Sequence, residues 1–177
     1  MRQNELTREI EFLNHQKQDW KTAHGIWENI RGLTIGTTTK ARAYLGTDQN
    51  DITSGTATKV QLDTESYDPG SHFDPTTNYR FTVPEAGYYQ IIGCIAYKNI
   101  VADKQYGCFI RKNGSNIFQP LLHSSHNAFL MVTATDIQYL AKDDYIELFC
   151  YHNAGVNTVD IASGSHRTYL SIHILSK

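Results

Sequence analysis

The stretch from Asn78 to Lys98 constrains the fold most, because it contains two strand patterns joined by one tight corner. Residues Tyr79 to Val83 alternate apolar and polar side chains, a period of two that places three apolar groups on one face of a strand. Pro84 lacks an N–H and Gly87 can take a positive φ, so Pro-Glu-Ala-Gly predicts a turn. From Tyr88 to Tyr97 both parities are apolar or aromatic, which predicts a strand that is covered on both faces.

This corner resembles one that precedes the central strand of C1q-like domains, in the C1q and tumour-necrosis-factor superfamily. The family pattern is Phe-x-x-Pro-x-x-Gly-x-Tyr, and a Lys-Asn-Gly hairpin follows it downstream. Asn-Gly also suits the positive φ angles of a type I′ turn, whatever the family. The residues of this chain that match the two motifs are Phe81, Pro84, Gly87, Tyr89, Asn113 and Gly114.

Two later segments extend the resemblance over residues 41–177. The sequence from Tyr139 to Leu148 resembles the family's Leu-x-x-Gly-Asp-x-Val-x-Leu segment, although Lys142 stands where the family usually has Gly. Tyr169 to Leu175 resembles its closing strand, and the collagen-like Gly-X-Y stem of many members is absent from the sequence. The resemblance implies an all-β jelly-roll sandwich of the C1q and tumour-necrosis-factor type, assembled as a homotrimer.

The chain is predicted to have three parts. Residues 1–33 are expected to serve attachment or trimerisation through a helix over residues 4–31, with Asn4 placed to cap it and Gly32 placed to end it. Residues 34–40, which include consecutive Thr residues, are expected to be a linker. Residues 41–177 form the predicted C1q-like head.

Large side chains in the predicted helix recur at alternating spacings of four and three, which is the heptad spacing of a coiled coil. Polar Lys17 and His24 interrupt this stripe, and Gly25 costs about 1 kcal/mol relative to Ala. The pattern fits a self-associating coiled coil, and it also fits an amphipathic helix that packs on its own domain or on a larger assembly. The apolar members of the stripe, predicted to lie at a trimer interface, are Leu6, Ile10, Leu13, Trp20 and Trp27.

The strand pattern from Tyr145 to His152 has apolar residues on both faces. A monomeric sandwich needs one apolar face on each strand, so aromatic side chains on the second face call for another cover. A neighbouring subunit of a trimer is the simplest cover. The residues predicted to lie at this interface are Tyr145, Phe149 and Tyr151.

Charge and hydropathy argue against several classes of function. The chain has 16 Lys and Arg against 18 Asp and Glu, a net charge of -2, so it has no basic surplus for nucleic acid or an anionic bilayer. No apolar run approaches the roughly 20 residues of a membrane span, and the polar N-terminus predicts synthesis in a cytosol without membrane insertion. Cys94, Cys108 and Cys150 lie in apolar strand patterns and are expected to be buried free thiols.

The sequence gives no support to an enzyme. Its eight His residues contain no His-x-His cluster of the cupin type, and neither a Gly-x-Ser-x-Gly turn nor a Gly-rich phosphate loop is present. His123 and His126 are three residues apart in a polar loop, without an evident third ligand. We therefore expect a protein without catalytic residues, metal or cofactor.

Three polar loops are expected to carry recognition, namely Asp48–Gly55, Asn99–Lys104 and Gly155–Ser165. A trimeric knob on a helix, without signal peptide, collagen or disulfides, fits a bacteriophage virion protein such as a capsid decoration, a head fibre or a tail tip. The helix would attach to a capsid or tail protein, and the head would bind a host-surface glycan or protein. The alternative is a bacterial or spore-surface C1q-like adhesion protein.

Overall fold

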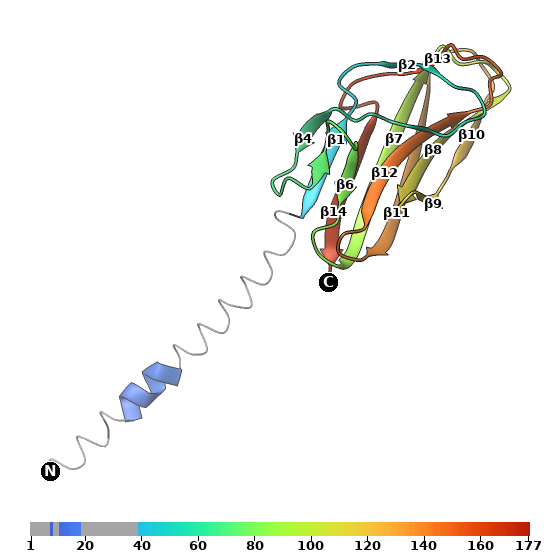
Figure 1. Cartoon of the computed structure of the whole chain (residues 1–177). Coiled ribbons are helices and arrows are strands. Elements are labelled where there is room, and N and C mark those ends of the chain that lie inside the picture. Colours follow the sequence, from blue (N-terminus) through green and yellow to red (C-terminus); the bar gives the residue numbers. More distant parts are fainter. Residues whose placement is uncertain (1–7, 9–10, 19–38) are drawn as a thin grey trace. The chain divides into compact units, whose positions relative to one another are not determined.

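The fold is described from a computed structural model, which places residues 8, 11–18 and 39–177 (Figure 1). The chain divides into two units, Met1–Ile35 and Gly36–Lys177. In the first unit, residue 8 and residues 11–18 are helical, and Phe12 and Leu13 are exposed. The predictions for Leu6, Ile10, Trp20 and Trp27 lie outside the described residues.

Residues 39–177 form two seven-stranded sheets in which every strand pairing is antiparallel. Sheet A has the order β2-β13-β7-β14-β1-β4, and β11 pairs with β7. Its strands are β1 (Lys40–Tyr44), β2 (Gln49–Ile52), β4 (Thr64–Tyr67), β7 (Gly87–Lys98), β11 (Leu130–Leu140), β13 (Val159–Ile161) and β14 (Tyr169–Ser176).

Sheet B has the order β10-β8-β12-β6-β5, with β3 paired to β12 and β9 paired to β8. Its strands are β3 (Thr58–Lys59), β5 (Phe73–Asp74), β6 (Arg80–Thr82), β8 (Lys104–Lys112), β9 (Ser115–Phe118), β10 (Leu121–Ser124) and β12 (Tyr145–His152). The predicted all-β sandwich of two antiparallel sheets is therefore confirmed.

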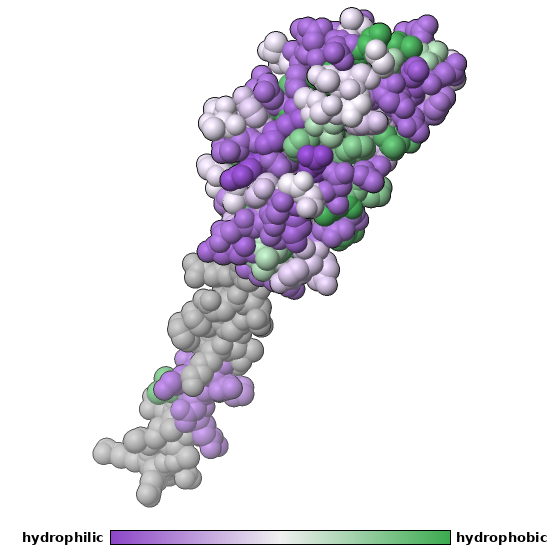
Figure 2. Space-filling view, turned by 45° about the vertical axis from the view of Figure 1, so that its right-hand side comes forward, coloured by the Kyte–Doolittle hydropathy of each residue, from purple (hydrophilic) through white to green (hydrophobic). Residues whose placement is uncertain are grey.

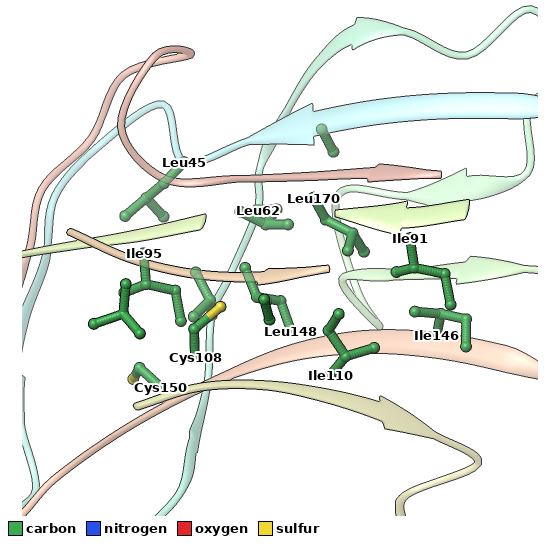
Figure 3. Packing of buried hydrophobic residues seen from close by; sticks show 14 of the residues in the cluster. Leu45, Leu62, Ile91, Ile95, Cys108, Ile110, Ile146, Leu148, Cys150 and Leu170 are labelled. Carbon is green, nitrogen blue, oxygen red and sulfur yellow. The ribbon is translucent and has the colours of Figure 1, made fainter. Parts of the chain in front are cut away.

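The hydrophobic core lies between the two sheets, where alternate residues of each strand point inward (Figure 3). Gly93 lets β8 and β12 approach β7 closely, because a Cβ at this position would meet Leu148 Cδ1 at 2.6 Å. The predicted buried thiols Cys94, Cys108 and Cys150 are confirmed. Core residues labelled in Figure 3 are Leu45, Leu62, Ile91, Ile95, Cys108, Ile110, Ile146, Leu148, Cys150 and Leu170.

The predicted corner joins β6 of sheet B to β7 of sheet A. Phe81 and Val83 are buried as expected, but Tyr79 has a φ of 49° and lies outside the strand. Gly87 is also required for a different reason from the predicted positive φ. A Cβ at Gly87 would lie 2.5 Å from the backbone carbonyl oxygen of Ser176, so the close approach of β14 selects glycine here.

Two further local predictions can be compared with the fold. Asn113 and Gly114 have φ angles of 52° and 80°, as the predicted Asn-Gly hairpin requires. β7 is buried on both faces only in its second half, because Tyr88 near its start is 51% exposed. The first half of β7 therefore exposes its outer face.

Candidate functional site

The three loops predicted to carry recognition gather at one end of the sandwich. β1 begins and β14 ends at the opposite end (Figure 1). Short strands occupy part of two loops, since β2 lies within the first and β13 within the third. We call this end the distal surface, made of residues 45–57, 99–103 and 153–168.

Asp160 ties the distal surface together. Asp160 is 9% exposed, and its carboxylate accepts hydrogen bonds from the Asp51 backbone N–H at 3.0 Å and from Asn99 Nδ2 at 2.7 Å. Ser54 and Asn157 add a second tie, because the Ser54 N–H donates to Asn157 Oδ1 at 2.9 Å. One buried side chain therefore holds all three predicted loops in fixed relative positions.

Asp48 makes a third connection at this end. It forms an ion pair with Lys98, and its Oδ1 accepts a hydrogen bond from the Ser163 N–H at 2.6 Å. These bonds, the one from Lys98 first, lower the pKa of Asp48 to about 2. The carboxylate is therefore charged at physiological pH, as the ion pair with Lys98 requires. A role of the distal surface in recognition stays a prediction.

The outer face of sheet B carries the aromatic residues that were predicted to lie at a trimer interface. Tyr145, Phe149 and Tyr151 are half-buried within the single chain. The Arg80 guanidinium lies 4.4 Å from the centre of the Tyr145 ring, and that of Arg111 lies 3.9 Å from the Phe149 ring.

The Tyr151 ring is covered by the Phe109 ring, which stacks on it with the two ring centres 5.7 Å apart. Each of the three predicted interface rings therefore has a cover from its own chain, which removes the reason for invoking a neighbouring subunit at this face. The placement of a subunit interface on these rings stays a prediction.

The outer face of sheet A has uncovered apolar side chains instead. Ile137 and Tyr139 of β11 are 55% and 52% exposed, and Tyr139 contacts the equally exposed ring of Tyr88 across the β7–β11 pair at 5.5 Å. The adjoining edge of sheet B also has uncovered aliphatic groups, and hydrophobic patches are visible on the surface in Figure 2. The exposed large hydrophobic residues of the two regions are Tyr88, Phe118, Leu121, Leu122, Phe129, Met131, Ile137, Tyr139 and Leu175.

An open groove of about 720 Å³ lies at the β1, β4 and β14 side of sheet A, lined by Lys40, Tyr67, Asp68, Pro69 and His173. Tyr67 stacks on His173, and the Tyr67 hydroxyl is 2.7 Å from His173 Nε2. Burial, and then the charge of Lys40, lower the pKa of His173. The groove therefore favours the neutral form of this imidazole.

The described residues offer little for covalent or metal chemistry. Residues 8, 11–18 and 39–177 contain no group of three or more His, Cys, Asp or Glu that could hold a metal ion. His126 Nδ1 accepts a hydrogen bond from the Ala128 N–H at 3.2 Å within its own loop. Burial raises the pKa of Cys150 to about 12, so this thiol is not a nucleophile at neutral pH.

Comparisons with known proteins support the fold. No protein-family model and no curated protein sequence matches the chain. Murine APRIL aligns with a TM-score of 0.54 at 14% identity, over 77% of this chain and 99% of that one.

Two further solved structures give the same result. The globular domain of zebrafish complement 1qA aligns with a TM-score of 0.56 at 10% identity, over 78% of this chain and 98% of that one. Eiger TNF from S. frugiperda aligns with a TM-score of 0.59 at 10% identity, over 78% and 92%. The head thus has the C1q and tumour-necrosis-factor jelly-roll fold, as the corner and hairpin motifs implied.

Within the described residues, no helix is long and apolar enough to cross a membrane.

Proposed function

We propose that this chain is a non-enzymatic structural and binding protein whose head forms a homotrimer through the outer face of sheet A. The observation that carries the proposal is the pair of bare aromatic rings of Tyr88 and Tyr139, beside Ile137, on the two paired strands β7 and β11. Contiguous exposed apolar side chains on a soluble domain favour burial against a partner. The resemblance to C1q-like domains makes two further copies of the same chain the preferred partner.

This location differs from the one favoured by the sequence alone. The rings of Tyr145, Phe149 and Tyr151 gain little from a neighbouring subunit, because guanidinium groups or another ring already cover them. Tyr139 and Ile137, by contrast, each expose more than half of their surface. We therefore assign self-association to sheet A, which leaves sheet B facing outward.

We further place the protein on a bacteriophage particle, as a capsid decoration, head fibre or tail tip. In this proposal residues 1–33 attach to a capsid or tail protein, and the distal surface meets a glycan or protein of the host. The position of Lys40 supports this division of roles, because β1 starts at the end of the head opposite the distal surface (Figure 1). The alternative, a C1q-like adhesion protein of a bacterial or spore surface, would use the same head.

Sedimentation equilibrium on the full chain tests the homotrimer. We expect a mass three times that of the 20.1 kDa chain, and a monomer at every concentration would contradict the proposal. Electron micrographs of purified phage particles labelled with an antibody against the chain test the location. Labelled bacterial or spore envelopes, with unlabelled particles, would support the adhesion protein instead.

A further inference from the structure

The outer face of sheet B has two guanidinium groups arranged around a buried carboxylate. In the strand register, Glu147 of β12 is paired with Arg80 of β6 on one side and with Arg111 of β8 on the other. Neighbouring strands are about 4.8 Å apart, so the backbones of the two Arg residues are separated by about 10 Å. Directly paired residues share a face of the sheet, and the two side chains therefore start from the same surface.

The negative charges on this face are already engaged. Glu147 is 5% exposed, and its Oε1 pairs with Lys59 Nζ at 2.5 Å. Asp74, the neighbour of Arg80 on β5, accepts five hydrogen bonds from the turn that follows it, at Thr76, Thr77 and Asn78.

Within residues 39–177, neither Arg80 nor Arg111 has a carboxylate oxygen within 4 Å. Arg111 donates one hydrogen bond, from Nε to Asn116 Oδ1 at 2.7 Å. Its terminal nitrogens have no such acceptor among these residues. Lys59, Arg80 and Arg111 thus outnumber Glu147 and Asp74 by one positive charge, on a chain whose net charge is -2.

Each of the two guanidinium groups lies over an aromatic ring of β12. Arg80 lies over the ring of Tyr145 and Arg111 over the ring of Phe149, at 4.4 and 3.9 Å from the ring centres. A stacked guanidinium keeps its N–H groups in its own plane, where they can reach an acceptor beside the ring. We call the parallel N–H groups of one guanidinium a fork. Two forks whose guanidinium groups already lie over rings lose little side-chain entropy when they bind planar anions.

We propose that this face binds the carboxylate groups of an acidic polysaccharide. A carboxylate matches the two parallel N–H groups of each guanidinium, and the separation of the forks favours a polymer that presents repeated anions over a single small ion. Gln105, which is exposed on β8, has an amide nitrogen that can donate to sugar hydroxyls. The site is separate from the distal surface and does not depend on the proposed trimer.

The same geometry disfavours two other polyanions. Single-stranded nucleic acids bind through bases that stack on open ring faces, whereas the ring faces of Tyr145 and Phe149 are occupied by guanidinium groups. Protein partners are usually anchored by large apolar or aromatic side chains that enter pockets. Here the rings are half-buried in a flat sheet, and the most exposed aromatic residues lie on sheet A.

The test is binding of the full chain to polygalacturonate, a uronic acid polymer, measured by isothermal titration calorimetry at low and moderate salt. Neutral dextran is the uncharged control. We expect binding to polygalacturonate that weakens with added salt, and none to dextran. Replacing both forks, Arg80→Gln with Arg111→Gln, should weaken binding by at least about tenfold, because two charge-assisted bidentate contacts are lost.

A matched variant separates a built site from general charge attraction. Lys104→Gln with Lys142→Gln removes the same charge from residues outside this face, and it should change the affinity by less than about twofold. Arg80→Lys with Arg111→Lys keeps the charge but loses the forks, and it should bind more weakly than the wild type. Circular dichroism melting must show that all variants are folded.

Several results would overturn the proposal. These are absence of binding to polygalacturonate, equal losses in the fork variant and the matched variant, or equal binding to dextran. Stronger binding of oligothymidylate or of polyglutamate, with the same dependence on Arg80 and Arg111, would assign the face to nucleic acid or to acidic peptides. None of these results bears on self-association, which sedimentation measures separately.

Discussion

Aromatic rings on β12 of sheet B are covered by their own chain, whereas two aromatic rings on the β7–β11 pair of sheet A are not. On sheet B, cations from the neighbouring strands lie over Tyr145 and Phe149. On sheet A, the rings of Tyr88 and Tyr139 contact each other and otherwise face outward. An apolar residue on the outside of a sandwich therefore predicts an interface only when the strands beside it provide no cover.

The largest effect should come from a charge placed on the outer face of sheet A, beside the exposed rings of Tyr88 and Tyr139. Tyr139→Arg would bury an unpaired guanidinium in the proposed interface, so we expect complete loss of the trimer in sedimentation equilibrium. Phe149→Arg is the counterpart on sheet B, and there we expect the trimer to persist. The opposite pair of results would place the interface on β12, where the sequence alone puts it.

The next largest effect concerns the carboxylate beneath the covered face. Glu147→Gln removes the partner of Lys59, and we expect the free energy of unfolding to fall by about 1–2 kcal/mol, a value below that of a fully buried pair because Lys59 is about one-third exposed. Urea denaturation measures this change. The more exposed pair of Lys177 and Glu85 is the control, and Lys177→Gln should cost less than about 0.5 kcal/mol.

The stability of the head and the charge on the outer face of sheet A should also depend on pH. Burial lowers the pKa of His173 below its unfolded value of about 6.5, so the folded head disfavours the protonated form, and stability falls as the pH drops below that value. His173 lies against Tyr67 and is paired with Lys40 in the strand register, so protonation adds a positive charge beside that of Lys40.

We therefore expect the trimer to dissociate more readily at pH 5 than at pH 7.5, as measured by sedimentation. His173→Gln should reduce this difference. A trimer whose affinity is the same at both pH values would show that His173 lies away from the interface.

The smallest effect should come from the contact between the Arg80 guanidinium and the Tyr145 ring. A double-mutant cycle with Arg80→Met and Tyr145→Leu isolates the contact between the guanidinium and the ring, for which we expect a coupling free energy of about 0.5–1 kcal/mol. Thermal or urea denaturation of the four proteins provides it. A coupling free energy of zero would mean that the guanidinium covers the ring but that their contact does not stabilise the folded head.

Features that depend on neighbours in the chain could be predicted from the sequence. The Asn113-Gly114 turn needs two positive φ angles, and the alternation around Phe81 identifies a strand, so both motifs and the all-β fold followed from local patterns.

Features that depend on register could not be predicted. The position of Arg80 beside Tyr145 follows from the pairing of β6 with β12, which no short motif encodes. The motif identifies Gly87 and predicts a positive φ there, but the close approach that selects glycine is to the carbonyl of Ser176, almost ninety positions away in the chain. The left-handed backbone of Tyr79 likewise has no signal in an alternating pattern that continues through it.

The buried carboxylate of Asp160 has a consequence for how the head can diversify. Because Asp160 fixes the backbone at Asp51 and the side chain of Asn99, exposed neighbours such as Asn50 and Thr158 can change without moving the loops. A library randomised at such positions, with Asp160 and Asn157 retained, would vary the exposed side chains on a constant framework. If the distal surface carries the proposed recognition, this arrangement lets its target change through substitutions that leave the loop backbones in place.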